Sequence, residues 1–214
     1  MDKYQVAIVI PAFNEENTIF DVVHSVKEYG TAIVIDDAST DNTRQLAINA
    51  GAIVIIHNRN KGYDEALNSG FVEADRRDFD AIITFDADGQ HSSKMLKKYI
   101  DNLKQGVDLV LGVRPKPARF SEWIFMLYTL IRFGWKDPLC GMKGYSMILY
   151  RSQGYFDSYN SVGTELSYYG FKNKYSLKQL SIPIKKRVDT PRFFSIFRSN
   201  ICILKVLVKM VINK

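Results

Sequence analysis

Short apolar runs alternate along the first half of the chain with segments in which apolar residues recur at helical spacing. The runs are residues 6–10, 32–35, 52–56, 81–85 and 107–111. Their apolar character is continuous, which predicts strands that are covered on both faces. Strands that alternate with helices are typical of a mostly parallel sheet, so we expect an α/β fold.

The segments between these runs carry the spacing and the end signals of helices. Residues 19–26 place four apolar side chains at i, i+3, i+4 and i+7, after a polar run that offers capping groups and before Gly30, which ends the helix. Three further helices are predicted, one between residues 41 and 51, one over residues 63–74 and one that starts at residues 92–93.

The second half of the chain departs from this rhythm. Residues 121–135 are apolar on nearly every face but too few to span a bilayer. The segment is either a buried helix or a lid or membrane-facing helix beside a lipid-binding groove. Residues 201–214 place Lys205 and Lys209 among apolar residues, which predicts a basic amphipathic helix. That helix either packs on the domain or lies on an anionic membrane.

Length, cysteine usage and charge set the broad class. The 214 residues fit one domain, placed at residues 1–190, with the amphipathic tail at residues 191–214. Two distant cysteines without a CxxC pair argue against a disulfide framework and a zinc site. The first apolar run is broken by Pro11 and is too short for a signal peptide, so we expect a cytoplasmic protein. The net charge of +6 favours an anionic partner.

Polar clusters follow three of the predicted strands, at residues 11–16, 36–41 and 86–91. Ligands of parallel sheets gather at the carboxyl ends of the strands, so these clusters are the candidate site. Asp86 and Asp88 flank one residue, and extended geometry puts both carboxylates on one side, about 7 Å apart. Hard oxygen ligands of this kind suit Mg²⁺ or Mn²⁺. The alternative is a solvated turn with helix-capping aspartates.

Two further clusters have both a functional and a structural interpretation. Capping of the next helix accounts for residues 39–41 but not for the adjacent carboxylates of Asp36 and Asp37, one of which suits hydrogen bonds from a nucleobase or ribose. The loop at residues 58–62 opens a helix and contains Lys61, so it suits an anion. A plain surface loop is the competing interpretation of that segment.

Taken in order, these motifs resemble family 2 glycosyltransferases of the GT-A fold, a Rossmann-like single domain. Within that family they look most like the dolichyl- or polyprenyl-phosphate sugar transferase branch. The resemblance covers roughly residues 4 to 190. The motifs that carry it are residues 11–15, 36–41, 58–62, 86–91, 111–114, 137–142, Glu165 with Leu166, and residues 182–184 leading to Arg187.

The resemblance implies roles for particular residues on the donor side. The nucleoside pocket would be lined by Pro11, Ala12, Phe13 and Glu15, with Asp37 at the base or ribose. Lys61 would contribute to nucleotide-sugar binding. The metal-binding stretch would run over Asp86, Ala87 and Asp88, with Gln90 as a further oxygen ligand.

Basic and acidic residues later in the chain are implied on the phosphate and acceptor side. Arg114 and Arg187 would bind the donor diphosphate or the acceptor's phosphate, whereas surface ion pairing is the default interpretation of either arginine alone. Asp137 is the first candidate for the acceptor-side carboxylate and Glu165 the second. Asp137 would act as general base if the acceptor is a hydroxyl; a polyprenyl phosphate is already ionised and needs a base less.

The implied enzyme is a metal-dependent, inverting hexosyltransferase that uses Mg²⁺ or Mn²⁺. Its donor would be a UDP-, GDP- or dTDP-linked sugar, and its acceptor a polyprenyl phosphate or a cell-surface glycan. We expect it in the cytoplasm, at the inner face of the cytoplasmic membrane if the tail binds lipid. A noncatalytic nucleotide-binding or regulatory α/β domain is the alternative. No stripe of interleaved basic and aromatic residues is evident, so no nucleic-acid partner is expected.

Overall fold

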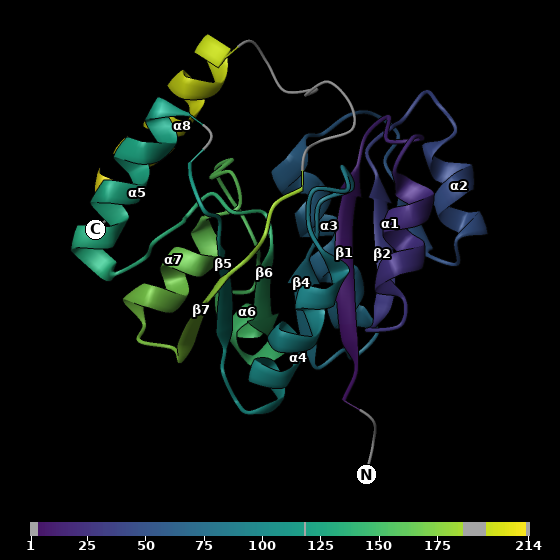
Figure 1. Cartoon of the computed structure of the whole chain (residues 1–214), viewed down its shortest axis with the longest axis horizontal. Helices are drawn as coiled ribbons and strands as arrows, with labels where there is room; N and C mark the ends of the chain where they lie inside the picture. The colour runs from purple at the N-terminus through teal and green to yellow at the C-terminus, as the bar shows by residue number, and fades with distance from the viewer. Residues whose placement is uncertain (1–3, 118, 186–195, 213–214) are drawn as a thin grey trace.

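Seven strands form one sheet in the order β3-β2-β1-β4-β6-β5-β7 (Figure 1). The computed structural model describes residues 4–117, 119–185 and 196–212. The strands are β1 (Val6–Ala12), β2 (Thr31–Asp36), β3 (Ile53–Ile56), β4 (Ala81–Thr84), β5 (Leu109–Val113), β6 (Lys143–Ser146) and β7 (Leu177–Ser181). All five predicted strands are confirmed, and the chain is a single α/β domain with a mostly parallel sheet, as expected.

β6 and β7 are the strands that the apolar pattern does not predict. β6 runs antiparallel between β4 and β5, and its four residues are buried even though they begin with Lys143. β7 pairs in parallel with β5 at the edge of the sheet and exposes most of its side chains. Neither strand has the continuous apolar run that marks the others, because β6 is short and polar and β7 has solvent on one side.

The helices cover both faces of the sheet and form two hydrophobic cores. Alternate residues of β1 point to opposite faces: Ile8 and Ile10 belong to the core that includes residues of α1, α2 and α4, whereas Ala7 and Val9 belong to the core that includes residues of α3, α5, α6, α7 and α8. The helices are α1 (Ile19–Val26), α2 (Thr43–Asn49), α3 (Tyr63–Arg76), α4 (Leu96–Lys104), α5 (Phe120–Phe133), α6 (Met147–Gln153), α7 (Glu165–Lys172) and α8 (Ile196–Ile212), with a short 3-10 turn η1 (Ser93–Met95) before α4. The four helices predicted in the first half are confirmed.

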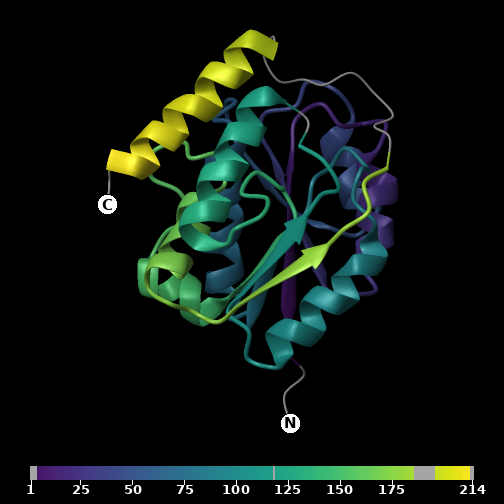
Figure 2. The same cartoon turned by 60° about the vertical axis from the view of Figure 1, so that its left-hand side comes forward.

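α5 and α8 lie side by side at one end of the molecule (Figure 2). α5 buries one face through residues such as Phe125 and Thr129, and α8 packs on the domain through Ile203, Val206 and Met210. Both helices nevertheless expose apolar side chains on the opposite face. Within the described part of the chain, no helix is both long and apolar enough to cross a bilayer.

Candidate active site

The three predicted polar clusters meet at one edge of the sheet. Ala12 at the end of β1 is in register with Asp36 at the end of β2, and the backbone N–H of Asp37 donates to the Ala12 carbonyl at 2.9 Å. β4 ends beside β1, where the backbone N–H of Phe85 donates to the Val9 carbonyl at 3.0 Å. The parallel register therefore places the segments at residues 11–16, 36–41 and 86–91 along the same rim.

Asp37 holds the loop that follows β3. Its Oδ1 lies 2.6 Å from Nδ1 of His57 and accepts the Lys61 backbone N–H at 2.8 Å, while its Oδ2 accepts the Gly62 backbone N–H at 2.8 Å. The Asp37 residue is only 4% exposed. The loop at residues 57–62 is thus tied to the end of β2 through the carboxylate that the sequence placed at the nucleoside. The Lys61 side chain is exposed at the surface.

The ends of β1 and β2 are cross-linked by a second set of hydrogen bonds. Asp36 accepts the Ser39 backbone N–H at 3.0 Å, which makes it a turn-forming residue. Asn14 has a left-handed backbone with φ 54°, and its amide oxygen accepts the Thr40 backbone N–H at 2.8 Å. Glu15 is buried and its backbone N–H donates to Thr43 Oγ1 at 2.7 Å. Pro11 is partly buried, Ala12 is buried, and Phe13 is 37% exposed on the same rim.

Asp86 is the most accessible carboxylate of the predicted metal-binding stretch. Its side chain is 29% exposed, and its Oδ2 lies 2.9 Å from Nε2 of His91. Burial raises the pKa of the Asp86 carboxyl, but the hydrogen bond with His91 and the nearby positive charge of Arg114 outweigh burial and hold that pKa below its ordinary value. Asp86 is therefore ionised at neutral pH. The hydroxyl of Tyr63 donates to its Oδ1 at 3.4 Å.

Gly141 leaves the room that the Asp86 carboxylate occupies. A Cβ built on Gly141 would lie 2.2 Å from Oδ2 of Asp86 and 2.7 Å from its Cγ and Oδ1. Real Cβ atoms essentially never approach so closely, so a side chain at position 141 would displace the carboxylate. The turn at residues 139–142, which the sequence indicated as a motif, thus shapes the candidate metal site directly.

The donor atoms of this stretch fit a hard divalent cation whose ligand shell is completed by other molecules. Asp88 is 8% exposed and turns its Oδ1 to the Gln90 backbone N–H at 3.0 Å, and Ala87 between the two aspartates is buried. In the described residues, no group of three or more His, Cys, Asp and Glu side chains is placed to hold a metal ion. The carboxylates of Asp86 and Asp88 and the amide oxygen of Gln90 form an incomplete set of metal ligands. Such a set is expected where substrate phosphates supply the remaining ligands.

Arg114 and Asp137 form a buried ion pair at the end of β5. The Arg114 guanidinium donates to both carboxylate oxygens of Asp137, at 2.8 and 2.9 Å, and the Arg114 backbone N–H donates to Oδ2 at 3.0 Å. The same guanidinium donates to Glu122 of α5 at 3.1 Å, and Glu122 also pairs with Arg119. The structure therefore brings these two predicted site residues together, and each is already the partner of the other.

Glu122 is a member of this network that the sequence argument did not single out. It is 4% exposed and is the one acidic residue in the apolar segment at residues 121–135. A lone carboxylate in an apolar helix is costly to bury unless it is paired, and that isolation is the signal that indicates a buried ion pair here. Through Glu122, α5 is linked to the end of β5.

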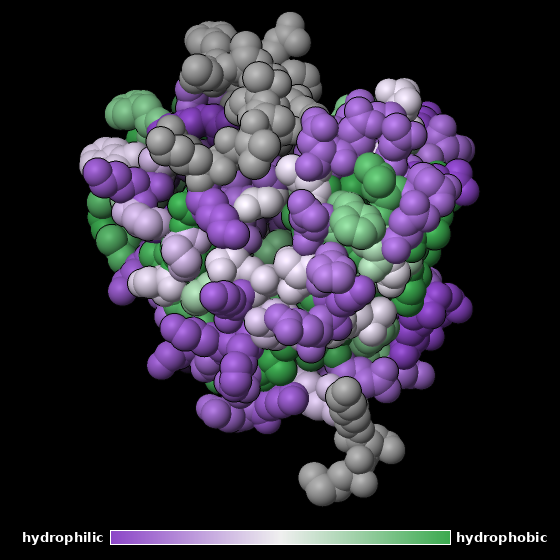
Figure 3. Space-filling view, turned by 45° about the vertical axis from the view of Figure 1, so that its right-hand side comes forward, coloured by the Kyte–Doolittle hydropathy of each residue, from purple (hydrophilic) through white to green (hydrophobic). Residues whose placement is uncertain are grey.

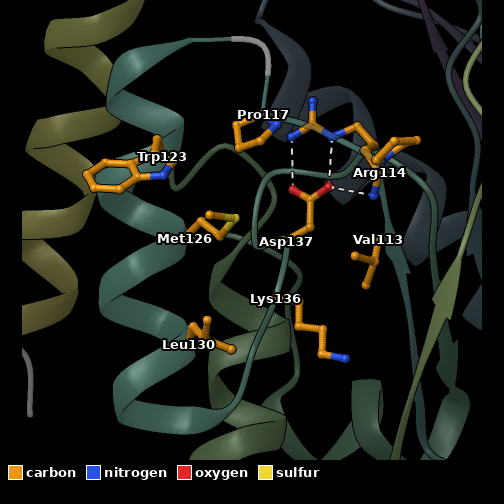
Figure 4. A pocket seen from close by; sticks show the side chains of 9 residues that line it. Val113, Arg114, Pro117, Trp123, Met126, Leu130, Lys136 and Asp137 are labelled. Carbon is orange, nitrogen blue, oxygen red and sulfur yellow. Dashed lines mark hydrogen bonds and ion pairs between the residues drawn. The ribbon is translucent and has the colours of Figure 1, made fainter.

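A groove of about 410 Å³ opens between α5 and the Arg114–Asp137 pair (Figure 4). Met126 and Leu130 project from α5 toward the side where Asp137 and Lys136 lie. The lining is largely apolar, with the charged groups at one side. It consists of Val113, Arg114, Pro115, Pro117, Trp123, Met126, Leu130, Lys136 and Asp137. The groove joins the loop at residues 137–142, which ends against Asp86.

Glu165, the second acceptor-side candidate, lies at the start of α7 and is held by Ser158. Its carboxylate accepts the Ser158 backbone N–H at 2.6 Å and the Ser158 hydroxyl at 2.8 Å. Burial raises its pKa above the ordinary value. The structure gives no hydrogen bond that joins Glu165 to Asp86, Asp88 or Asp137 among the described residues.

A buried lysine supports the loop that carries Glu165. Nζ of Lys143 donates to the Gly163 carbonyl, and burial lowers the pKa of Lys143 to about 8. Asp64 of α3 accepts the backbone N–H groups of Val162 at 3.1 Å and Gly163 at 2.6 Å. Burial and the neighbouring charge of Asp157 raise the pKa of Asp64 to about 7. Arg187, the other predicted phosphate-binding arginine, lies outside the described residues.

Comparisons with known proteins agree with this geometry. The chain matches the model of the protein family described as glycosyl transferase family 2 over residues 7–201. A Methanococcus voltae protein named UDP-N-acetylglucosamine–dolichyl-phosphate N-acetylglucosaminyltransferase is 32% identical over 136 residues, covering 54% of each chain. A Pseudomonas fluorescens protein named undecaprenyl-phosphate 4-deoxy-4-formamido-L-arabinose transferase is 30% identical over 141 residues, covering 58% of this chain and 40% of that protein. The chain spans about half the length of the curated relatives it matches.

A solved structure confirms the fold. Glucosyl-3-phosphoglycerate synthase from Mycobacterium tuberculosis, crystallised with Mn²⁺, UDP and phosphoglyceric acid, is similar with a TM-score of 0.78. The sequence identity is 20%, and the similarity covers 98% of this chain and 78% of that one. The GT-A fold implied by the motifs is thus confirmed, and the two relatives above agree with the polyprenyl-phosphate branch that the motifs resemble.

Proposed function

Because this chain belongs to glycosyl transferase family 2, we propose that it transfers a sugar from a nucleotide-sugar to a polyprenyl phosphate, with inversion at the anomeric carbon. The observation that carries the proposal is the arrangement of two unlike regions around one turn. Within the loop at residues 137–142, Gly141 lies against Asp86 of the acidic rim, and Asp137 lines the apolar groove together with Arg114. A charged donor and a lipid-linked acceptor would meet at that turn.

On the donor side, Asp37 acts mainly by fixing the loop at residues 57–62 as one wall of the nucleoside pocket. Its three hydrogen bonds hold that loop against the end of β2. Pro11, Ala12 and Phe13 form the facing wall at the end of β1. The UDP complex of the similar mycobacterial structure supports a uridine nucleotide as the first donor to test.

Asp86, Asp88 and Gln90 are the residues that would hold Mg²⁺ or Mn²⁺. A divalent cation at this place supplies positive charge against the negative charge that grows on the leaving nucleoside diphosphate. The residues of this chain prepare the position: His91 and Tyr63 orient the Asp86 carboxylate, and Gly141 leaves the space for it. The Mn²⁺ in the similar crystal structure supports this assignment.

The groove favours the lipid-linked phosphate over a glycan as acceptor, because most of its lining is apolar and its cations are Arg114 and Lys136. A phosphate acceptor is already ionised and attacks without a general base. Asp137 then serves to hold Arg114 in place. For a hydroxyl acceptor, Asp137 would have to release Arg114 before it could take a proton.

The test is a panel of UDP-, GDP- and dTDP-sugars with Mn²⁺ or Mg²⁺, scored for thermal stabilisation and for released nucleotide in the presence of polyprenyl phosphate. We expect one donor to stabilise the protein and to turn over only with metal and acceptor. Asp88→Ala abolishes both effects, whereas Asp101→Ala, an exposed aspartate of α4, changes neither. Stabilisation without turnover across the panel supports the noncatalytic nucleotide-binding domain instead, and unchanged turnover of Asp88→Ala contradicts the metal assignment.

A further inference from the structure

The outward faces of α5 and α8 expose large apolar side chains on two helices that contact each other. On α5, Phe120 is 74% and Ile131 78% exposed, and on α8, Val208 is 55% exposed. We call this the α5–α8 surface, and it consists of Phe120, Trp123, Leu127, Leu130, Ile131, Ile201, Leu204, Val208 and Val211. By contrast, the face in Figure 3, on the side of α1 and α2, carries many hydrophilic residues with smaller hydrophobic patches between them.

The exposed charges around this surface are all positive in the described residues of the two helices and the α5 N-cap. Lys205 and Lys209 are exposed on α8 and Arg132 is exposed in the last turn of α5, whereas Arg119 at the α5 N-cap is partly buried and paired with Glu122. The single acid of these segments, Glu122, is buried and paired with arginines. An apolar face whose own two helices expose only cations is complementary to an anionic lipid surface. A second copy of the same surface would bring like charges together, which disfavours self-association through it.

The surface is continuous with the groove described above. Trp123 and Leu130 belong to both: they line the groove, and they are 48% and 41% exposed. The core-facing residues of α5, such as Phe125, point away from this side. An acyl or prenyl chain in a bilayer that contacted the surface would therefore meet the open side of the groove.

We infer that the α5–α8 surface docks on an anionic lipid bilayer and presents the groove to lipids in the membrane. The role that we give to docking, delivery of a lipid-linked phosphate, rests on the proposed function. The docking itself is independent of catalysis. It also assigns each helix two faces, one packed on the domain and one in contact with lipid.

Vesicle co-flotation tests the docking with the full chain and closely matched variants. Ile131→Asp with Val208→Asp removes two apolar side chains from the surface. Ile148→Asp with Val72→Asp is the control, because Ile148 is 72% and Val72 60% exposed on α6 and α3, away from the surface. We expect the first pair to weaken partition into phosphatidylglycerol-containing vesicles on the order of tenfold or more, and the control to leave it unchanged.

The charge of the surface has its own test. Lys205→Gln lowers partition into the same vesicles by about fivefold, and raising the salt concentration removes the difference. Equal binding to purely zwitterionic vesicles, or binding that the Ile131 and Val208 substitutions leave intact, would overturn the inference. A dimer in solution that the same substitutions dissociate would also overturn it, because the surface would then be a contact between copies of this chain.

A water-soluble, short-chain prenyl phosphate separates this inference from the proposed function. The Ile131→Asp, Val208→Asp variant should transfer sugar to the soluble acceptor at the rate of the unsubstituted protein and lose transfer to the long-chain acceptor embedded in vesicles. Equal loss with both acceptors overturns the role of the surface in delivery. If the unsubstituted protein binds vesicles but transfers sugar to neither acceptor, the proposed function is refuted and the docking is confirmed.

Discussion

Gly141→Ala is the smallest change that tests whether the position of Asp86 matters for catalysis. The new Cβ would lie 2.2 Å from Oδ2 of Asp86, and ordinary van der Waals contact begins at 3.4 Å, so one of the two must move by about 1.2 Å. The carboxylate is held by His91, which contacts the same Oδ2, and by Tyr63, which contacts Oδ1. A move of this size therefore breaks at least one of those contacts.

The expected loss of activity follows from the size of that displacement. Misplacing a group in an active site by about 1 Å can lower the rate about 100-fold, which corresponds to about 2.7 kcal/mol in the activation barrier. Gly141 is partly buried, and overpacking typically costs about 1–3 kcal/mol of folding stability. We therefore expect Gly141→Ala to lower kcat/KM about 100-fold and to lower Tm by several degrees while the protein stays folded.

The assay compares nucleotide release, Mn²⁺ binding and thermal unfolding of Gly141→Ala with those of Gly170→Ala. Gly170 lies inside α7, where a Cβ would meet the side chains of Leu109 at 3.2 Å and Leu149 at 3.5 Å and no candidate site residue, so activity should be unchanged. We expect Gly141→Ala to bind Mn²⁺ more weakly than the unsubstituted protein, and Gly170→Ala to bind it equally well. Full activity of Gly141→Ala with an unaltered response to Mn²⁺ would refute the reasoning.

Three other substitutions test the surrounding structure by urea denaturation. Asp37→Asn places an amide N–H where the carboxylate accepted backbone N–H groups, so the unfolding free energy should fall by about 1–3 kcal/mol. Stabilisation of the protein by the nucleotide-sugar should fall as well. An unchanged midpoint of urea unfolding contradicts this. Arg114→Gln leaves buried carboxylates without their partner and should lower the unfolding free energy by about 3–5 kcal/mol. Adding Asp137→Asn in a double variant should restore part of that free energy. Hydrogen bonding from Arg76 lowers the pKa of Glu73 to about 2, below its ordinary value of 4.5, so the stability that Glu73 adds is present above pH 4.5 and is lost as the pH falls toward 2. The difference between the protein and Glu73→Gln should therefore shrink over that range, and a difference independent of pH would contradict the ion pair.

Strands β1 to β5 and the first four helices could be predicted from the sequence because their signals are local. Each buried parallel strand is a continuous apolar run, and each of those helices carries its own spacing and end residues. β6 escaped prediction because its burial depends on its neighbours: Lys143 is stabilised inside the protein by the Gly163 carbonyl, twenty residues away. No local pattern marks such a residue as part of a strand.

The candidate site was predictable in its location and less so in its contacts. Parallel strands bring their carboxyl ends to one rim, so the clusters containing Asp37 and Asp86 had to lie near each other. The partners of these residues depend on long-range geometry, as the pairs Asp37 with His57 and Arg114 with Asp137 show. For the segments at residues 121–135 and 201–214, packing on the domain is confirmed for one face of α5 and of α8, whereas contact with a membrane stays a prediction about the exposed apolar face.

Sugar transfer to a lipid-linked phosphate is the central claim, and one measurement addresses it most directly. The purified chain is incubated with a radiolabelled UDP-, GDP- or dTDP-sugar in turn, together with Mn²⁺ and polyprenyl phosphate in anionic vesicles. Label in the lipid fraction is counted for this reaction, for Asp88→Ala and for a sample without metal. The account predicts labelled lipid, of inverted anomeric configuration, in the complete reaction alone. No labelled lipid with any of the UDP-, GDP- and dTDP-sugars, or equal labelling by Asp88→Ala, would contradict it.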